Sequence, residues 1–262
     1  LFALNFILPL HISPLPSDHF SNFTSRIWAW LEYVVGIAAV VVIVHYRASI
    51  LKRDVIQATV LAGLNWIGRY TMNRGLYDAT TESVITALAF TAAVVMFRKI
   101  AKEHVLSIKA FAGERPDIVK SILYGIAFAI PLSVVNIAYF WFASGPRYPG
   151  NLTESFLGAL HPGISEEIIF RYFIIALCLL ILHGHLSQKL LVFTTLLLAV
   201  VPHSLAHLPD LMLSNPGAGV FLLVITSLLF GLPMALLQVK KNLESAISFH
   251  WFIDFTRFLL GF

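Results

Sequence analysis

A succession of long apolar segments, separated by short polar loops, constrains the fold of this chain most. In a bilayer every backbone N–H and C=O group needs a partner inside the protein, and an apolar segment of about 20 residues finds these partners as an α-helix. Only 12% of the residues are charged and 58% are hydrophobic, with a mean hydropathy of +0.82, whereas a soluble domain has about 25% charged residues. We therefore predict an all-α, polytopic bundle of transmembrane helices.

Segments bounded by charged residues or by Pro and Gly predict about eight helices in a single integral membrane domain. An eighth segment, at 55–68, is weaker because it contains Asn65. Residues 98–120 are amphipathic and predict an interfacial helix. Residues 1–12 are too short to span a bilayer and predict the end of a truncated first helix or a re-entrant piece. The clear apolar segments are 27–46, 83–97, 121–143, 168–182, 190–206, 218–239 and 245–262.

The basic residues predict the orientation of the chain. The net charge of +4 is modest and predicts no nucleic-acid partner. The loops 47–54, 98–120, 183–189 and 240–244 hold about three times as many Lys and Arg residues as the opposite loops, which predicts that they face the cytoplasm. We expect a multi-pass protein of a prokaryotic plasma membrane, with residues 166 and 207 near its outer side. The single cysteine, Cys178, excludes an intramolecular disulfide and a cysteine-rich metal site.

Three ionisable residues lie at the start of one apolar segment, in the sequence EEIIFR at 166–171. A charge near the bilayer centre costs about 2.5–3.5 kcal/mol, so such residues are functional candidates. Glu167 and Arg171 are four residues apart and therefore share a helix face, which also permits a purely structural ion pair. Glu166 points about 100° away and has no partner in its own turn. A carboxylate of this kind is a candidate general base.

Two further polar clusters repeat the four-residue spacing in other apolar segments. They are His203 with His207, in HSLAH, and His250 with Asp254, in HWFID. Each pair shares one helix face, where it can either join helices or form a site. Two histidines opposite a carboxylate favour a functional role. We therefore predict one polar intramembrane cavity, assembled from three helices.

Other polar and aromatic residues have simpler interpretations. His161 is expected near a loop or interface, where a solvated imidazole needs no special explanation. Glu32 is isolated near the start of a segment and is expected to reach the interface. Trp28 is expected in an interfacial aromatic belt, and Asn65 is expected to donate a hydrogen bond between helices.

The order Glu-Glu-x-x-x-Arg, then x-x-x-x-His, then His-x-x-x-Asp resembles the CAAX protease and bacteriocin-processing family of intramembrane glutamic-type endopeptidases. That family includes the type II CAAX prenyl endopeptidases. Its second motif is normally Phe-x-x-x-His, so His203 stands in the Phe position. The resemblance covers residues 151–262 as a catalytic helical core. Residues 1–150 match only as N-terminal membrane helices.

The resemblance implies hydrolysis of a peptide bond without an acyl-enzyme and without a cofactor. Glu166, helped by His207, would deprotonate a water molecule, and His250 with the residue at Asp254 would face the oxyanion. Because an ionised Asp254 repels an oxyanion, we expect it to hold His250 as an imidazolium instead. The substrate would be a membrane-anchored or lipidated protein or peptide in the lipid bilayer, cleaved near its C-terminus or anchor. The supporting residues would be Glu167, Arg171 and His203.

Two alternatives stay open at this point. Three protein ligands and a water make a catalytic zinc site, although the motif His-Glu-x-x-His is absent from the sequence. The chain could also be a non-catalytic scaffold or transporter that uses the polar cluster for binding. The alternative zinc ligands are Glu166, His203, His207 and His250.

Overall fold

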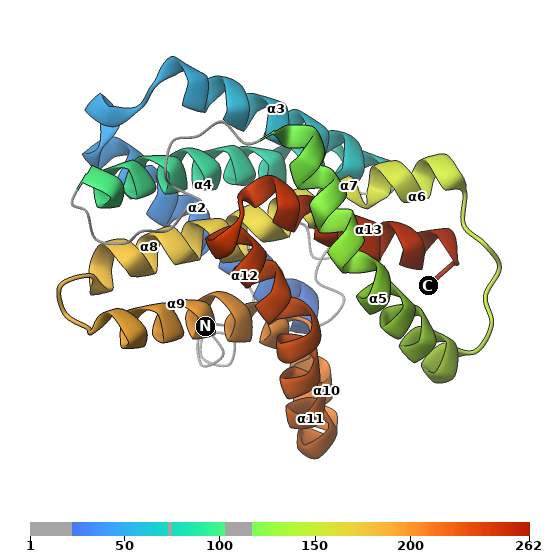
Figure 1. Ribbon diagram of the computed structural model, residues 1–262. Helices are drawn as coiled ribbons and strands as arrows, with labels where there is room; N and C mark the ends of the chain where they lie inside the picture. Colours follow the sequence, from blue (N-terminus) through green and yellow to red (C-terminus); the bar gives the residue numbers. More distant parts are fainter. Residues whose placement is uncertain (1–22, 73–74, 103–116) are drawn as a thin grey trace.

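The computed structural model describes residues 23–72, 75–102 and 117–262, and in these residues every regular element is helical (Figure 1). The all-α fold predicted from the apolar segments is therefore confirmed. The α-helices are α2 (Phe23–His45), α3 (Lys52–Thr71), α4 (Leu76–Lys102), α5 (Ile118–Ser144), α6 (Leu152–Gly158), α7 (Leu160–Glu166), α8 (Phe173–Leu182), α9 (Gln188–Ala206), α10 (Pro209–Ser214), α11 (Pro216–Thr226), α12 (Leu232–Lys240) and α13 (Leu243–Leu259).

Shorter elements complete the chain. A 3₁₀ turn, η3 (Arg47–Ser49), precedes α3. The π-helix η5 (Glu167–Tyr172) joins α7 to α8, and a second π-helix, η6 (Ser227–Gly231), joins α11 to α12. The predicted segments 168–182 and 218–239 therefore belong to longer continuous helical rods. The rod that carries the EEIIFR sequence begins at Leu160.

The predicted interfacial helix at 98–120 is only partly described. Residues 98–102 continue α4 and residues 118–120 begin α5. Both ends of that segment thus belong to long apolar helices rather than to an interfacial one. The remainder of the segment, like residues 1–12, lies outside the described residues.

Five helical segments are long and apolar enough to cross a membrane. The other predicted spans fall short. Helix α13 has only 17 residues, α3 carries four charged residues at its ends, and the rod through η5 contains Glu166, Glu167 and Arg171. With five candidate spans the chain is a multi-pass integral membrane protein. The spans are Ile27–His45, Leu76–Ala101, Ile118–Ser144, Gln188–Ala206 and Pro216–Lys240.

Capping residues define where the helices of the C-terminal half begin. The Asn151 side chain accepts hydrogen bonds from the backbone N–H groups of Thr153 and Glu154 at the start of α6, at 2.9 and 3.1 Å. Asn242 does the same for Ser245 in α13, at 2.9 Å. Such caps satisfy N–H groups that have no partner inside the helix. They fix the register at which α13 presents its polar face.

Contacts between helix ends agree with the predicted orientation of the loops. Arg98, near the end of α4, binds Asp54 at the start of α3 through Nη2 at 2.7 Å. Asn242, before α13, donates to the Ser121 hydroxyl at the start of α5, at 2.8 Å. Loops that we place in the cytoplasm therefore lie at common ends of the helices. The side of the membrane that they face stays a prediction.

Candidate active site

A change of helix type separates the two neighbouring glutamates. Glu166 is the last residue of α7 and Glu167 the first of η5, in which hydrogen bonds run from i to i+5. The Glu167 side chain is completely buried, whereas 14% of the Glu166 side chain is exposed. The two carboxylates thus face different surroundings, and only Glu166 faces a cavity.

Glu167 is buried and accepts hydrogen bonds from residues of three helical segments. Its Oε1 accepts from Arg171, four residues later, and from His250 Nδ1 at 2.8 Å. Its Oε2 accepts from Gln238 Nε2 of α12 at 2.8 Å. The ion pair with Arg171 follows from the helical spacing, but the contacts with α12 and α13 required the structure. Gln238 was not recognised from the sequence, because one amide in an apolar segment carries no motif.

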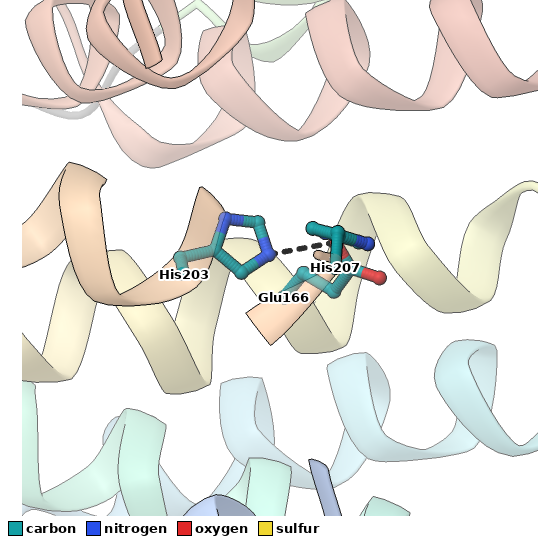
Figure 2. A group of neighbouring side chains, drawn as sticks. All are labelled: Glu166, His203 and His207. Carbon is teal, nitrogen blue, oxygen red and sulfur yellow. Dashed lines mark hydrogen bonds and ion pairs between the residues drawn. The ribbon is translucent and has the colours of Figure 1, made fainter. Parts of the chain in front are cut away.

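Glu166 is the point at which the three polar clusters of the sequence meet. Its Oε2 accepts a hydrogen bond from His203 Nε2 at 2.9 Å, as Figure 2 shows, with His207 beside them. The same oxygen lies 3.8 Å from His207 Nε2 and 3.7 Å from His250 Nε2. The structure therefore brings together one carboxylate from α7 and three imidazoles, from α9, from the residue that follows α9 and from α13.

His250 and Asp254 pair along α13, as their spacing indicated. His250 Nε2 lies 3.3 Å from Asp254 Oδ2, and Asp254 Oδ1 accepts from Arg257 Nη2 at 2.8 Å. Arg257 is a site residue that sequence reasoning missed. Its spacing of three residues from Asp254 was the available signal. The Asp254 carboxylate is therefore held by two cationic or proton-donating partners.

Aromatic rings enclose the two histidines of α9. Phe170 stacks on His203 with ring centroids 5.1 Å apart, and Trp28 meets the His203 ring edge to face at 5.6 Å. The Trp28 ring also contacts the His207 ring, with ring centroids 4.8 Å apart. Trp28 thus belongs to the wall of the site, a role that its interpretation as part of an interfacial belt did not include.

A second polar cluster joins helices α3, α4 and α7. Glu82 binds Arg69 Nε at 2.9 Å and His161 Nδ1 at 2.9 Å, and Arg69 Nη1 donates to His161 Nε2 at 2.7 Å. Asn65 Nδ2 donates to the Ser83 hydroxyl of α4 at 3.3 Å, as expected, and Asn65 Oδ1 lies 3.3 Å from His161 Nδ1. His161 is buried, and its interpretation as a solvated histidine was wrong. Nothing in the local sequence connects Arg69, Glu82 and His161, because each of the three comes from a different helix.

A cavity of about 700 Å³ connects both clusters. Glu32 lines it, so this carboxylate faces the cavity rather than the membrane interface. The predicted polar cavity is therefore present. Its acidic, basic and histidine lining residues are Glu32, Arg69, Asp78, Glu82, His161, Glu166, Arg171, His203, His207, His250, Asp254 and Arg257.

Three of the four candidate zinc ligands come close enough together to share an ion. The donor atoms of Glu166, His203 and His207 all lie within 4.8 Å of one another. His250 is not part of this group of donor atoms. A metal at this point would thus be held by α7, by α9 and by the residue that follows α9.

Comparison with known protein families matches residues 149–256 to the description "Type II CAAX prenyl endopeptidase Rce1-like". The match begins before α6 and ends just before Arg257, so it includes every residue of the three motifs. Searches of the curated proteins and of the solved structures found no match. Over residues 149–256 the chain is therefore similar to the Rce1-like type II CAAX prenyl endopeptidases.

Proposed function

We propose that the chain is a metal-independent intramembrane endopeptidase with Glu166 as its general base. The family supports CAAX-type proteolysis in general. The convergence of Glu166, His207 and His250 on one cavity is the observation that carries the finer proposal. The Glu166 Oε2 atom is 3.8 Å from His207 Nε2 and 3.7 Å from His250 Nε2. These separations exceed a direct hydrogen bond and leave room for the reacting groups.

The attacking species in this proposal is a water molecule bound by Glu166 and His207. Glu166 takes a proton from the water while the water oxygen forms a bond to the carbonyl carbon of the substrate. The carbon–nitrogen bond of the tetrahedral intermediate then breaks, and Glu166 returns the proton to the departing amine. His207 orients the water through Nε2. No covalent intermediate with the protein is required.

His250 supplies the positive group that faces the oxyanion. Carboxylate oxygens accept at both of its ring nitrogens, from Glu167 at 2.8 Å and from Asp254 at 3.3 Å. This arrangement supports an imidazolium, as expected from the resemblance. Arg257 holds Asp254 on its other oxygen, so Asp254 orients His250 rather than facing the oxyanion. Because both N–H groups of His250 are directed to carboxylates, the imidazolium would stabilise the oxyanion through its positive charge.

The hydrogen bonding of His203 supports the metal-independent form of this proposal. A histidine that binds a metal donates its other ring N–H to an acceptor. The Nδ1 atom of His203 instead lies 2.7 Å from Arg171 Nη2, which can only donate. Nδ1 must therefore be the unprotonated nitrogen, so Nε2 carries the proton and has no lone pair for zinc. A zinc site would lose one of its three nearest ligands.

The substrate that we propose is a membrane-anchored or lipidated protein cleaved near its C-terminus or anchor. Apolar residues such as Phe140, Phe230 and Met234 line the cavity beside the charged groups. Such a lining can accommodate an apolar chain next to a peptide bond. The predicted orientation places the cavity toward the outer side of a prokaryotic plasma membrane.

The experiment that tests this proposal compares protein termini in cells. Wild type and Glu166→Gln are expressed at equal abundance, and C-termini and peptide termini are compared by mass spectrometry. Glu154→Gln is the matched control, because Glu154 is exposed on α6 and takes no part in the cavity lining. We expect termini that are present with wild type and Glu154→Gln and absent with Glu166→Gln.

Identical termini in all three strains would contradict the proposal and favour a scaffold or transporter. Cleavage that requires added zinc, and that is lost on chelation, would contradict its metal-independent form. The same strains also reveal the substrate, because the differing termini identify the protein that is cut. Their position relative to the membrane shows the side on which cleavage occurs.

A further inference from the structure

His203 connects a buried arginine to the proposed general base. Arg171 Nη2 donates to His203 Nδ1 at 2.7 Å, and His203 Nε2 donates to Glu166 Oε2 at 2.9 Å. His203 and Arg171 are both buried, with 4% and 2% of their surfaces exposed. The hydrogen bonds that connect the two charged groups through His203 are therefore shielded from solvent.

The chemistry of the three groups fixes the direction of both hydrogen bonds. A guanidinium has only donors, so Nδ1 of His203 must accept. A neutral imidazole that accepts at Nδ1 carries its single proton on Nε2, and that proton is directed to Glu166. Glu166 Oε2 is thereby held toward α9, as Figure 2 shows. Rotation of the carboxylate would break this bond in a buried setting, where an unpaired donor is costly.

The cluster of Arg69, His161 and Glu82 gives an internal comparison, because it has the same three residue types. There the arginine donates to His161 and also binds Glu82 directly, so the three groups form a closed ring. Arg171 instead binds Glu167, and no arginine of the described residues lies within ion-pair distance of Glu166. His203 thus orients Glu166 without an arginine neutralising it.

We propose that His203 is a positioning residue: its ring, which accepts a hydrogen bond from Arg171, holds Glu166 Oε2 in place beside His207 and His250. The inference rests on the proposed function for its catalytic consequence, but the hydrogen-bonding arrangement is independent of it. His203 also packs against Phe170 and Trp28. The test must therefore separate its hydrogen bonds from its ring contacts.

The first experiment determines the tautomer of His203 without any measurement of activity. Purified full-length protein in lipid nanodiscs is labelled with ¹⁵N-histidine, and long-range ¹H–¹⁵N spectra are recorded at neutral pH. The resonances of His203 are those lost in His203→Phe. We expect a neutral ring protonated on Nε2. A ring protonated on Nδ1, or on both nitrogens, would overturn the proposal.

The second experiment compares His203→Phe with His203→Gln on the substrate found from the termini. Phe keeps an aromatic ring and removes both hydrogen bonds. Gln has an oxygen that can accept from Arg171 and an amide that can donate to Glu166. We expect kcat to fall about 10- to 100-fold in His203→Phe with little change in KM, and to recover partly in His203→Gln. Unchanged kcat in His203→Phe, or equal losses in both variants, would overturn the proposal.

The two experiments keep this inference distinct from the proposed function. If wild type cleaves nothing, the proposed function fails and the tautomer measurement still decides the arrangement of His203. If wild type cleaves its substrate and His203→Phe does so equally well, only the inference fails. Thermal unfolding of both variants shows whether loss of activity reflects loss of folded protein.

Discussion

Replacing Gly163 with alanine is expected to impair the site while leaving the fold nearly as stable as before. Gly163 lies on α7, three residues before Glu166, and faces Trp251 of α13. A Cβ atom at position 163 would lie 3.0 Å from Trp251 Cβ, 3.1 Å from its backbone N and 3.2 Å from its Cα. Carbon atoms in contact prefer about 3.5–4.0 Å. Because two of these atoms are backbone, α7 and α13 must separate by about 0.5 Å.

Two opposing contributions determine the stability of Gly163→Ala. Alanine favours a helix over glycine by about 1 kcal/mol, whereas overpacking costs about 1–3 kcal/mol. The expected net loss is therefore about 0–2 kcal/mol in the free energy of unfolding. This movement of α7 away from α13 would increase the distance between Glu166 of α7 and His250 of α13. A displacement of about 1 Å can reduce a rate about 100-fold, so a displacement of about 0.5 Å predicts about a 10-fold lower kcat.

The assay for Gly163→Ala combines reversible denaturation in mixed micelles with cleavage of the substrate identified from protein termini. Gly63→Ala is the control, because a Cβ at that position of α3 meets nothing within 4 Å. Gly63→Ala should retain full activity and gain up to about 1 kcal/mol of stability. If Gly163→Ala is as active as Gly63→Ala, close packing of α7 on α13 does not set the geometry of the site.

Further predictions concern Glu167, metal dependence and orientation. Glu167→Ala should lower the free energy of unfolding by about 3–5 kcal/mol, because it leaves Arg171 buried without its carboxylate partner. Glu167→Gln keeps a hydrogen-bond acceptor and should lower it less. Equal losses in the two variants would refute this account of Glu167. Incubation with a zinc chelator should leave cleavage unchanged. In a Cys178→Ala background, a cysteine at Leu213 should react with an impermeant maleimide in intact cells and one at Ser187 should not. The opposite pattern would reverse the predicted orientation.

Sequence reasoning succeeded where chemistry depends on local spacing. Glu167 with Arg171 and His250 with Asp254 are four residues apart on single helices, so the helical repeat alone brings each pair together. The ends of the apolar segments also indicated the helices, because charged residues and caps interrupt the hydrophobic pattern. Even the weak segment at 55–68 proved to be helical, in α3.

Sequence reasoning failed where a group depends on partners from several helices. His161 appeared solvated, yet it lies buried between Arg69 and Glu82 from two other helices. Trp28 lies in an aromatic run of the kind found at membrane interfaces. Only the approach of α2 to α9 in the structure shows that it contacts His203. The contact between Arg171 and His203 spans 32 positions. No periodic pattern in one segment carries such information.

The π-helix η5 makes the site sensitive to chain length. An i to i+5 turn accommodates one more residue than an α-turn. Deleting a single residue such as Ile169 would permit regular α-helix throughout this rod. It would also rotate Glu166 by about 100° relative to Arg171 and the apolar residues of α8. The shorter chain would thus have a more regular helix but would lose the approach of Glu166 to His203.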